Sequence, residues 1–259
     1  MPFVTIIIPY KSNLKYLFLA LKSVFNQSYK NFKLIIVYDN IFKKDLKKIK
    51  IFLKKKNYFK KFKVKIINNK KNFGAGESRN IAIRKSNSKY IAFLDSDDTW
   101  SRDKLKIQVQ YMEKNNILFS HTSYNVVNTN NNIVSSRSAK KKITFQDLII
   151  SCDIGLSTVI LKSSLLSKNK FLFPKIKTKE DYVLWLKIIK KIKILRGLDI
   201  KLTHYRKTEG SLSSNKLLSL INGYKVYRNY MKFGVTKSFF YLFLLSINSL
   251  KKIAINYFN

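Results

Sequence analysis

The first hundred residues alternate short β-branched runs with segments of helical periodicity, and this alternation constrains the fold more than any other feature of the chain. Four runs have the length and composition of buried strands, at residues 4–8, 34–37, 64–67 and 90–94. Apolar residues recur at helical spacing over residues 14–25, between the first two runs. Strands joined by helices pair in parallel through right-handed crossovers. The sequence therefore predicts an α/β fold with a mainly parallel, Rossmann-like three-layer sheet.

The second half of the chain is less regular. Helices are predicted at residues 102–115 and 181–191, a strand at residues 158–161, and a hairpin whose arms are residues 124–127 and 133–136. Two helix-like stretches follow from about residue 216. In the first, Leu217, Ile221, Tyr224 and Met231 share one face, which Arg228 interrupts. We expect one α/β domain over residues 1–215 and a helical C-terminal appendage over residues 216–259.

The chain is strongly basic, with 52 Lys and Arg against 14 Asp and Glu and a formal net charge of +38. Only seven of these are Arg, whereas proteins that read nucleic acids favour the planar Arg fork. Solvated faces or an anionic membrane surface fit this charge better, and we expect no nucleic acid partner. The single cysteine, Cys152, excludes an internal disulfide and predicts a reduced, intracellular protein. The longest apolar run, residues 239–245, is far shorter than the about 20 residues that span a bilayer.

Three acidic residues crowd together directly after the strand predicted at residues 90–94: Asp95, Asp97 and Asp98. Ligands of parallel α/β sheets bind beyond the carboxyl ends of the strands. Crowded carboxylates repel one another unless a cation lies between them, and Mg²⁺ or Mn²⁺ binds carboxylate and phosphate oxygens. The cluster therefore predicts a metal–phosphate site. The alternative is a loop in which Asp98 only caps the next helix.

Two further motifs are ambiguous by themselves. Glu180 and Asp181 open the helix predicted at residues 181–191, and the helix dipole alone favours acids in a first turn. Gly74 and Gly76 precede a helix that carries Arg79, and glycine lets the backbone approach a ligand closely. The glycine spacing matches neither a Walker loop nor the dinucleotide fingerprint. Taken alone, the first motif fits helix capping and the second fits a structural turn.

In chain order, these motifs resemble those of the family 2 glycosyltransferases, inverting enzymes with the glycosyltransferase-A fold. The resemblance covers about residues 3–215. It rests on Pro9-Tyr10, residues 35–39, residues 72–80, residues 90–100, Glu180-Asp181 with Trp185, and Tyr205-Arg206. After the second strand the family usually has Asp-Asp-Gly-Ser, whereas this chain has Tyr38-Asp39-Asn40-Ile41. That departure concerns the preference for a nucleoside base rather than the fold.

The resemblance implies transfer of a sugar from a nucleotide-diphosphate sugar, most simply a UDP-sugar, to a hydroxyl of a saccharide or lipid-linked acceptor in surface polysaccharide or glycan synthesis. It implies a nucleotide-binding part at about residues 1–100 and an acceptor part at about residues 101–215. Asp181 would be the general base, and Trp185 would pack its helix. Asp97 would ligate a divalent cation, Mn²⁺ or Mg²⁺. The remaining donor-site residues would be Pro9, Tyr10, Asp39, Arg79, Asp95, Asp98 and Arg206, the last on a segment running through Ser211-Leu212-Ser213.

Two other functions stay open at this stage. A metal-dependent nucleotidyltransferase would use the same carboxylate–metal–phosphate site but would need no acceptor base. A non-enzymatic basic nucleic-acid-binding protein would explain the charge but not the acidic cluster.

The C-terminal segment combines positive charge with aromatic residues. Residues 201–259 carry eight Lys and two Arg against Glu209, with an aromatic-rich run at residues 239–245 and Tyr257-Phe258 near the end. Such a composition suits an interfacial helix on an anionic membrane. The other interpretation is that the helix packs on the catalytic domain or on a second subunit. We expect a cytoplasmic enzyme, peripheral at the inner face of the membrane.

Overall fold

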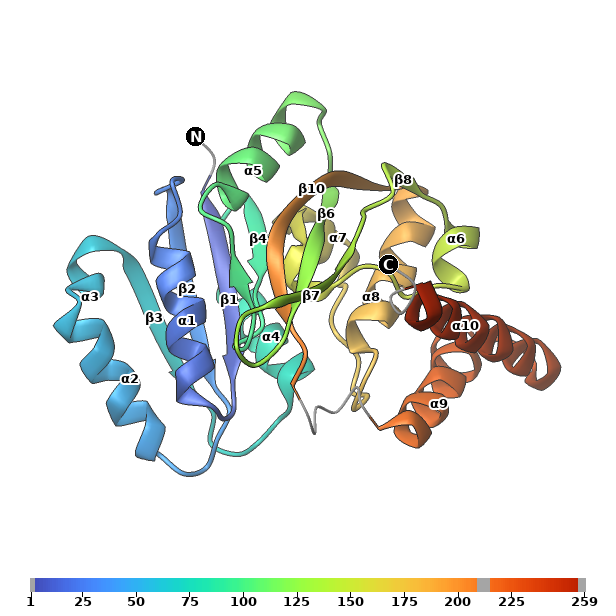
Figure 1. The fold of residues 1–259 in the computed structure, drawn as a ribbon, viewed down its shortest axis with the longest axis horizontal. Coiled ribbons are helices and arrows are strands. Elements are labelled where there is room, and N and C mark those ends of the chain that lie inside the picture. Colours follow the sequence, from blue (N-terminus) through green and yellow to red (C-terminus); the bar gives the residue numbers. More distant parts are fainter. Residues whose placement is uncertain (1–2, 209–214, 256–259) are drawn as a thin grey trace.

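A ten-stranded mixed sheet with helices on both faces makes up the computed structural model, which describes residues 3–208 and 215–255 (Figure 1). The strands are β1 (Val4–Tyr10), β2 (Phe32–Tyr38), β3 (Lys63–Asn68), β4 (Tyr90–Phe93), β5 (Thr99–Trp100), β6 (Phe119–Val127), β7 (Ile133–Arg137), β8 (Lys142–Ile143), β9 (Ile160–Lys162) and β10 (Leu195–Arg206). Their order is β3-β2-β1-β4-β9-β6-β10-β5, with β7 paired to β6 and β8 to β10. Ser211, Leu212, Ser213, Tyr257 and Phe258 lie outside the described residues.

The helices connect these strands and flank the sheet. They are α1 (Leu14–Phe25), α2 (Lys44–Lys55), α3 (Tyr58–Lys61), α4 (Ala75–Arg84), α5 (Lys104–Lys114), α6 (Phe145–Ile149), α7 (Ser163–Asn169), α8 (Glu180–Ile192), α9 (Lys216–Lys225) and α10 (Val235–Ile255). Single turns of other helical types lie at η1 (Leu156–Thr158) and η3 (Val226–Tyr230).

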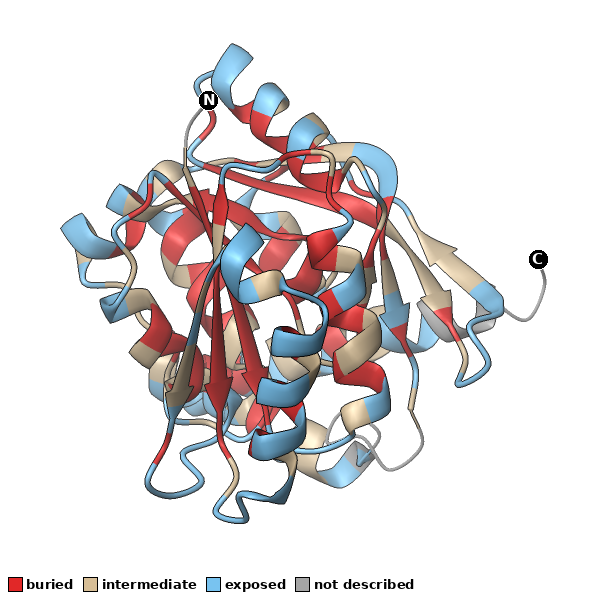
Figure 2. Ribbon diagram, turned by 90° about the vertical axis from the view of Figure 1, so that its left-hand side faces the viewer, coloured by how far each residue is buried: buried red, intermediate tan, exposed pale blue. Residues whose placement is uncertain are grey.

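The first four strands are parallel, as predicted. β1 lies between β2 and β4, and β2 pairs in turn with β3. Side chains of a strand alternate between its two faces, so Ile6 and Ile8 pack with α1, α2 and α5, whereas Ile7 packs with α4, α7 and α8. The buried strands lie between these two helical layers (Figure 2). The α/β class and the three-layer arrangement are therefore confirmed.

The second half of the sheet is mixed. β9 runs antiparallel to both β4 and β6, and the predicted hairpin forms as the antiparallel pair of β6 and β7. No periodicity predicted β10, which pairs in parallel with β6 along its length. Its register shifts twice between Leu198 and Thr203, where Asp199, Ile200 and Lys201 are exposed. These irregularities remove the alternation by which a strand is read from sequence.

The C-terminal helices pack on the sheet domain beside α8. Val226, Tyr227, Met231 and Leu245 belong to the same buried cluster as Trp185 of α8. The α9–α10 unit thus shares a core with the preceding domain, and the division at residue 215 remains a prediction. Among the described helices, none is long and apolar enough to cross a membrane.

Candidate active site

The carboxyl ends of the parallel strands meet at one edge of the sheet (Figure 1). Tyr10, at the end of β1, is in register with Tyr38, at the end of β2, and Tyr38 is in register with Asn68, at the end of β3. The residues that follow these strands are therefore neighbours at this edge. Asp39 comes directly after β2, and Asp95 comes two residues after β4.

Asp39 holds the glycine-containing segment in place. Its buried carboxylate accepts hydrogen bonds from the backbone N–H groups of Phe73 (2.9 Å) and Gly74 (2.8 Å), and from Asn69 Nδ2 (2.8 Å). Gly74 has a φ of +85°, a conformation that side-chain-bearing residues rarely adopt. The motif is thus a turn that requires glycine and is fastened to β2, and both oxygens of Asp39 are engaged by the protein.

Pro9 and Tyr10 lie inside the domain. Both are buried in β1, and Tyr10 Oη donates to Asp45 Oδ2 (2.8 Å) of α2 while its ring packs on Tyr38. Burial and the Asp45 carboxylate raise the pKa of Tyr10. These two residues therefore stabilise the carboxyl end of β1 from inside the domain.

Arg79 joins two parts of the chain that are far apart in sequence. Its guanidinium donates to Asp95 Oδ1 (2.6 Å) and to Glu180 Oε1 (2.8 Å), and its side chain is only 4% exposed. Burial lowers the pKa of Arg79, but the two carboxylates more than offset this, so the guanidinium remains charged. Arg79 therefore links the loop after β4 to the first residue of α8.

A second set of contacts fastens α4 to the segment that precedes α8. The Asn80 side chain exchanges two hydrogen bonds of 2.9 Å with the backbone N–H and C=O of Phe173. A Cβ atom at Gly76 would lie 3.3 Å from Glu180 Cγ, so a small residue permits the close approach. The family resemblance implies no site role for Asn80 or Glu180, although both lie in the motifs that carry it.

Asp98 is buried and acts within the loop after β4. Its carboxylate accepts from Ser157 Oγ (2.6 Å) and from the Arg206 backbone N–H (2.8 Å). Ser157 Oγ in turn accepts from the Asp95 N–H (3.0 Å). Burial, followed by the charges of Asp97 and Asp95, raises the pKa of Asp98 well above its usual range. Ser157 lies in η1 and contacts the loop from there, and no sequence motif identifies it.

Arg206 is also a buried bracing residue. Its guanidinium donates to the Asp97 carbonyl oxygen (3.0 Å), the Asn128 carbonyl oxygen (2.9 Å) and Asn131 Oδ1 (2.6 Å). It also lies 4.6 Å from the centre of the Tyr16 ring. Arg206 thus connects the acidic loop to the β6–β7 turn.

Asp97 differs from its two neighbours because none of the described side chains donates a hydrogen bond to its carboxylate. Burial and the nearby Asp95 raise the pKa of Asp97 to about 6. Within residues 3–208 and 215–255, no three His, Cys, Asp or Glu side chains are arranged to hold a metal ion by themselves. Mg²⁺ is usually bound by one or two carboxylates together with substrate phosphates, so one carboxylate that no described side chain engages fits this kind of site.

Asp181 lies in the first turn of α8 and is partly buried. Its Oδ1 accepts from the Tyr182 N–H (2.7 Å). Burial, followed by the charges of Glu180 and Asp95, raises the pKa of Asp181 to about 7, although the Tyr182 N–H and Arg79 act in the opposite direction. The charge of Asp95 also raises the pKa of Asp97. The first turn of α8 and the loop after β4 therefore share one electrostatic environment.

Trp185, one turn along α8, is fully buried, with its ring centre 5.0 Å from that of Phe119. It packs the helix in the core, as expected.

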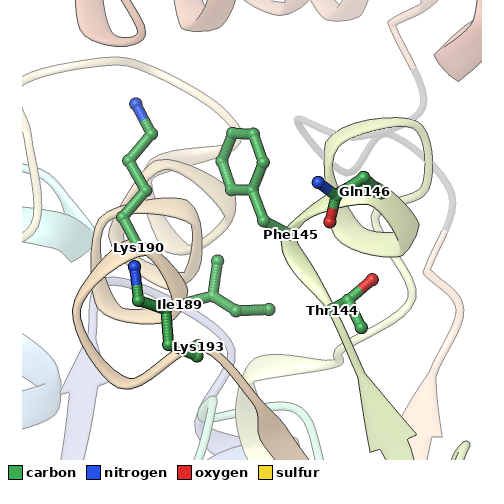
Figure 3. A pocket seen from close by; sticks show the side chains of 6 residues that line it. All are labelled: Thr144, Phe145, Gln146, Ile189, Lys190 and Lys193. Atoms are coloured by element: carbon green, nitrogen blue, oxygen red, sulfur yellow. The ribbon is translucent and has the colours of Figure 1, made fainter.

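A hollow of about 410 Å³ lies at the other end of α8 (Figure 3). It is lined by Thr144, Phe145, Gln146, Ile189, Lys190 and Lys193. No acidic side chain lines it, and Ile189 is eight residues beyond Asp181, about 12 Å along the helix axis. This hollow is separate from the carboxylate site.

Comparisons with known proteins point to one family. The model of glycosyl transferase family 2 matches residues 5–171. The chain is 34% identical over 241 residues to the UDP-Glc:alpha-D-GlcNAc-diphosphoundecaprenol beta-1,3-glucosyltransferase WfgD of Escherichia coli, which covers 93% of this chain and 90% of that protein. A glycosyltransferase of Rickettsia conorii is 36% identical over 211 residues, covering 80% of this chain but only 33% of the length of that protein.

Solved structures show the same fold. Staphylococcus aureus TarS 1–349 in complex with UDP-GlcNAc superposes with a TM-score of 0.69 at 20% identity, over 93% of this chain and 70% of that one. Pyrobaculum calidifontis mannosyltransferase PcManGT, in complex with GDP-Man and Mn²⁺, gives a TM-score of 0.67 at 13% identity, over 98% of this chain and 74% of that one. These likenesses confirm the expected glycosyltransferase-A fold.

Proposed function

The chain belongs to glycosyl transferase family 2, and on that premise we propose that it moves a sugar from a UDP-sugar to a hydroxyl of a lipid-linked saccharide. The Escherichia coli relative, most of whose length this chain spans, is named for UDP-glucose as donor and a diphosphoundecaprenol-linked acceptor. Membership of this family sets aside the two other functions, nucleotidyl transfer and nucleic acid binding. The reaction would serve the synthesis of surface polysaccharide or glycan.

The observation that supports this best is the state of Asp181. A general base is most effective when its pKa lies near the working pH, and burial raises the pKa of Asp181 to about 7. Its carboxylate shares an electrostatic environment with Asp95 and Arg79 at the ligand-binding edge of the sheet. A helix cap alone would need no such pKa.

The reaction we propose is a single displacement. Asp181 accepts the proton of the acceptor hydroxyl while that oxygen bonds to the anomeric carbon, on the face opposite the diphosphate. The bond from this carbon to the diphosphate oxygen breaks, and the configuration at the carbon inverts. Arg79 keeps Glu180, and with it the first turn of α8, at a fixed position relative to Asp95.

We assign to Asp97 the binding of a divalent cation, Mn²⁺ or Mg²⁺, together with the donor diphosphate. Five carboxylates gather around the loop after β4 and the start of α8, against two guanidiniums: Asp95, Asp97, Asp98, Glu180 and Asp181 against Arg79 and Arg206. This excess of negative charge favours a cation, and Asp97 is the loop carboxylate that no described side chain engages. When bound, the cation would stabilise the negative charge on the leaving diphosphate.

The remaining site residues are proposed to shape the donor pocket. Asp39 and the segment that it holds would line the nucleoside end, supported by Pro9 and Tyr10. Asp98 and Arg206 would fix the backbone on either side of Asp97. In this scheme residues 1–100 bind the nucleotide and residues 101–215 contribute the acceptor side. A lipid-linked acceptor would place the enzyme at the inner face of the membrane.

A transfer assay with purified protein tests the proposal. We expect UDP release that depends on a sugar nucleotide, on a diphosphoundecaprenol-linked saccharide and on Mn²⁺ or Mg²⁺. A thermal-shift screen of sugar nucleotides identifies the donor, since a ligand at 100 times its Kd adds about 2.7 kcal/mol of stability. Release of pyrophosphate in place of UDP would contradict glycosyl transfer.

A further inference from the structure

Helix α10 presents one apolar face to the domain and another to solvent. Its inner side is packed: Ser238 and Leu245 are buried, and Asn248 Nδ2 donates to the Ile150 carbonyl oxygen (2.9 Å). Successive residues of a helix are rotated by about 100°, so Phe239, Phe240 and Phe243 point away from that side. These three side chains are 57%, 57% and 61% exposed. Large apolar side chains grouped on a surface mark a binding site more often than isolated ones do.

Helix α9 extends this surface. Leu217, Leu220 and Ile221 are 69%, 45% and 45% exposed. They share a helix face with Tyr224, whose ring centre lies 4.9 Å from that of Phe239 in α10. The two helices are also close at Gly223, where a Cβ atom would come within 2.8 Å of a methyl group of Leu242. The exposed side chains form one surface, the tail patch: Leu217, Leu220, Ile221, Phe239, Phe240 and Phe243.

The segment that carries the tail patch has charges of one sign only. Residues 216–255 contain six Lys and one Arg and no acidic residue. Of the side chains that the structure describes in this segment, five are basic and exposed: Lys225, Arg228, Lys232, Lys237 and Lys251. A second copy of the chain would bring the same positive charge and no carboxylate from this segment to pair with it. An anionic lipid surface instead offers both an apolar layer for the phenylalanines and negative headgroups for the lysines.

Two hydrogen bonds join the C-terminal segment that carries the tail patch to the segment that precedes α8. Asn222 of α9 donates from Nδ2 to Thr178 Oγ1 (2.9 Å), and Tyr230 Oη donates to the Lys175 carbonyl oxygen (3.3 Å). Both acceptors lie in the segment that leads directly into Glu180 and Asp181. The α9–α10 unit thus lies beside the N-terminal end of α8 (Figure 1).

From these observations we propose that the tail patch docks on an anionic membrane surface. The phenylalanines of α10 enter the headgroup–acyl boundary, and the flanking lysines contact anionic headgroups. Docking holds the Asp181 edge of the domain next to the bilayer. The idea that docking brings a lipid-linked acceptor to Asp181 rests on the proposed function. The docking itself does not depend on that function.

Vesicle cosedimentation of the full chain tests the docking. We expect binding to vesicles of equimolar phosphatidylglycerol and phosphatidylcholine, weaker binding at high salt, and little binding to pure phosphatidylcholine. The triple variant Phe239→Ser, Phe240→Ser, Phe243→Ser should bind vesicles roughly tenfold or more weakly. The reason is that moving one aromatic side chain from water into the bilayer changes the affinity by about tenfold. Because these side chains are more than half exposed, the variant should stay folded, with only the loss in unfolding temperature expected from the Phe239–Tyr224 ring contact.

A matched control removes three exposed apolar side chains at the opposite end of the sheet, in and around the Lys-rich α2 and α3: Phe42→Ser, Ile51→Ser, Phe59→Ser. We expect this variant to bind vesicles as the wild type does. Loss of binding in the control with retention in the tail-patch variant would overturn the proposal and assign the membrane surface to α2 and α3. Wild-type protein that fails to sediment with anionic vesicles would also overturn it.

Two further measurements separate the remaining outcomes. If the tail-patch variant is monomeric by light scattering where the wild type is dimeric, a second copy covers the patch and lipid docking is wrong. Transfer is measured with a water-soluble acceptor analogue and with a lipid-linked acceptor in vesicles. The variant should retain the first activity and lose most of the second. A wild-type chain that binds anionic vesicles but transfers no sugar to either acceptor would contradict the proposed function alone.

Discussion

Replacing Asp181 with asparagine separates the catalytic interpretation of this residue from the capping one. Asn keeps the size of the side chain and an oxygen that accepts from the Tyr182 N–H, but it cannot take a proton from a hydroxyl. We expect transfer to fall roughly 10²–10⁴-fold, the usual contribution of a general base. Donor binding, measured by calorimetry, should not change.

The same substitution should stabilise the protein, and the gain should depend on pH. The pKa of Asp181 rises from 3.8 to about 7 in the folded chain, so the folded state binds more protons than the unfolded state between these pH values. Stability therefore decreases as the pH rises through this window. At about 1.4 kcal/mol per pH unit, ionised Asp181 costs at most about 4 kcal/mol at about pH 8 and less than about 1 kcal/mol near pH 4. Asp181→Asn removes this cost.

Urea unfolding of both proteins at about pH 4 and about pH 8 measures the difference. Asp147→Asn is the control, since Asp147 also lies in a helix first turn, but its hydrogen bonds with Thr144 lower its pKa. That variant should lose stability at neutral pH and transfer normally. If Asp181→Asn transfers normally and unfolds earlier, Asp181 is a cap and the base lies elsewhere. If transfer falls without a pH-dependent gain in stability, the burial argument is wrong.

Three further predictions concern the metal, the pH profile and the Arg79 bridge. Asp97→Ala should abolish Mn²⁺-dependent donor binding in calorimetry, whereas wild-type binding that persists in a chelator would exclude the metal role. At saturating Mn²⁺, kcat/KM should rise with pH and level off above an apparent pKa of about 7, because the deprotonated form of Asp181 is the base; a flat or falling profile would argue against this. Arg79→Met leaves Asp95 and Glu180 uncompensated and should lower the free energy of unfolding by about 3 kcal/mol in urea titration. An unchanged midpoint would show that the bridge contributes nothing.

Much of the site follows from local sequence. The buried run at residues 90–94 determines where β4 ends, and the acidic residues that follow it must lie at the carboxyl edge of a parallel sheet. Glu180 and Asp181 likewise had to occupy the first turn of a helix. In both cases the position depends on periodicity over a few neighbouring residues, and such periodicity is visible in the sequence.

Other properties of the same residues depend on contacts across the chain. Arg79 binds Glu180, 101 residues away, and Ser157 of η1 binds Asp98, 59 residues away. These contacts decide that Arg79, Asp98 and Arg206 are buried residues that hold the loop in place, while no side chain among the described residues donates a hydrogen bond to Asp97. The raised pKa of Asp181 has the same origin, since burial is its largest cause.

The tail shows the same division. The sequence by itself indicated that α10 is a helix rich in apolar and aromatic residues, in a segment without acids. Its longest uninterrupted apolar run, residues 239–245, is far shorter than a bilayer span. Because apolar residues occur all round this helix, its sequence pattern does not predict which face packs against the domain. Packing against the core buried Leu245 and left Phe239, Phe240 and Phe243 outside. The tertiary structure decided this because burial depends on which surfaces meet, whereas periodicity records only which residues share a face.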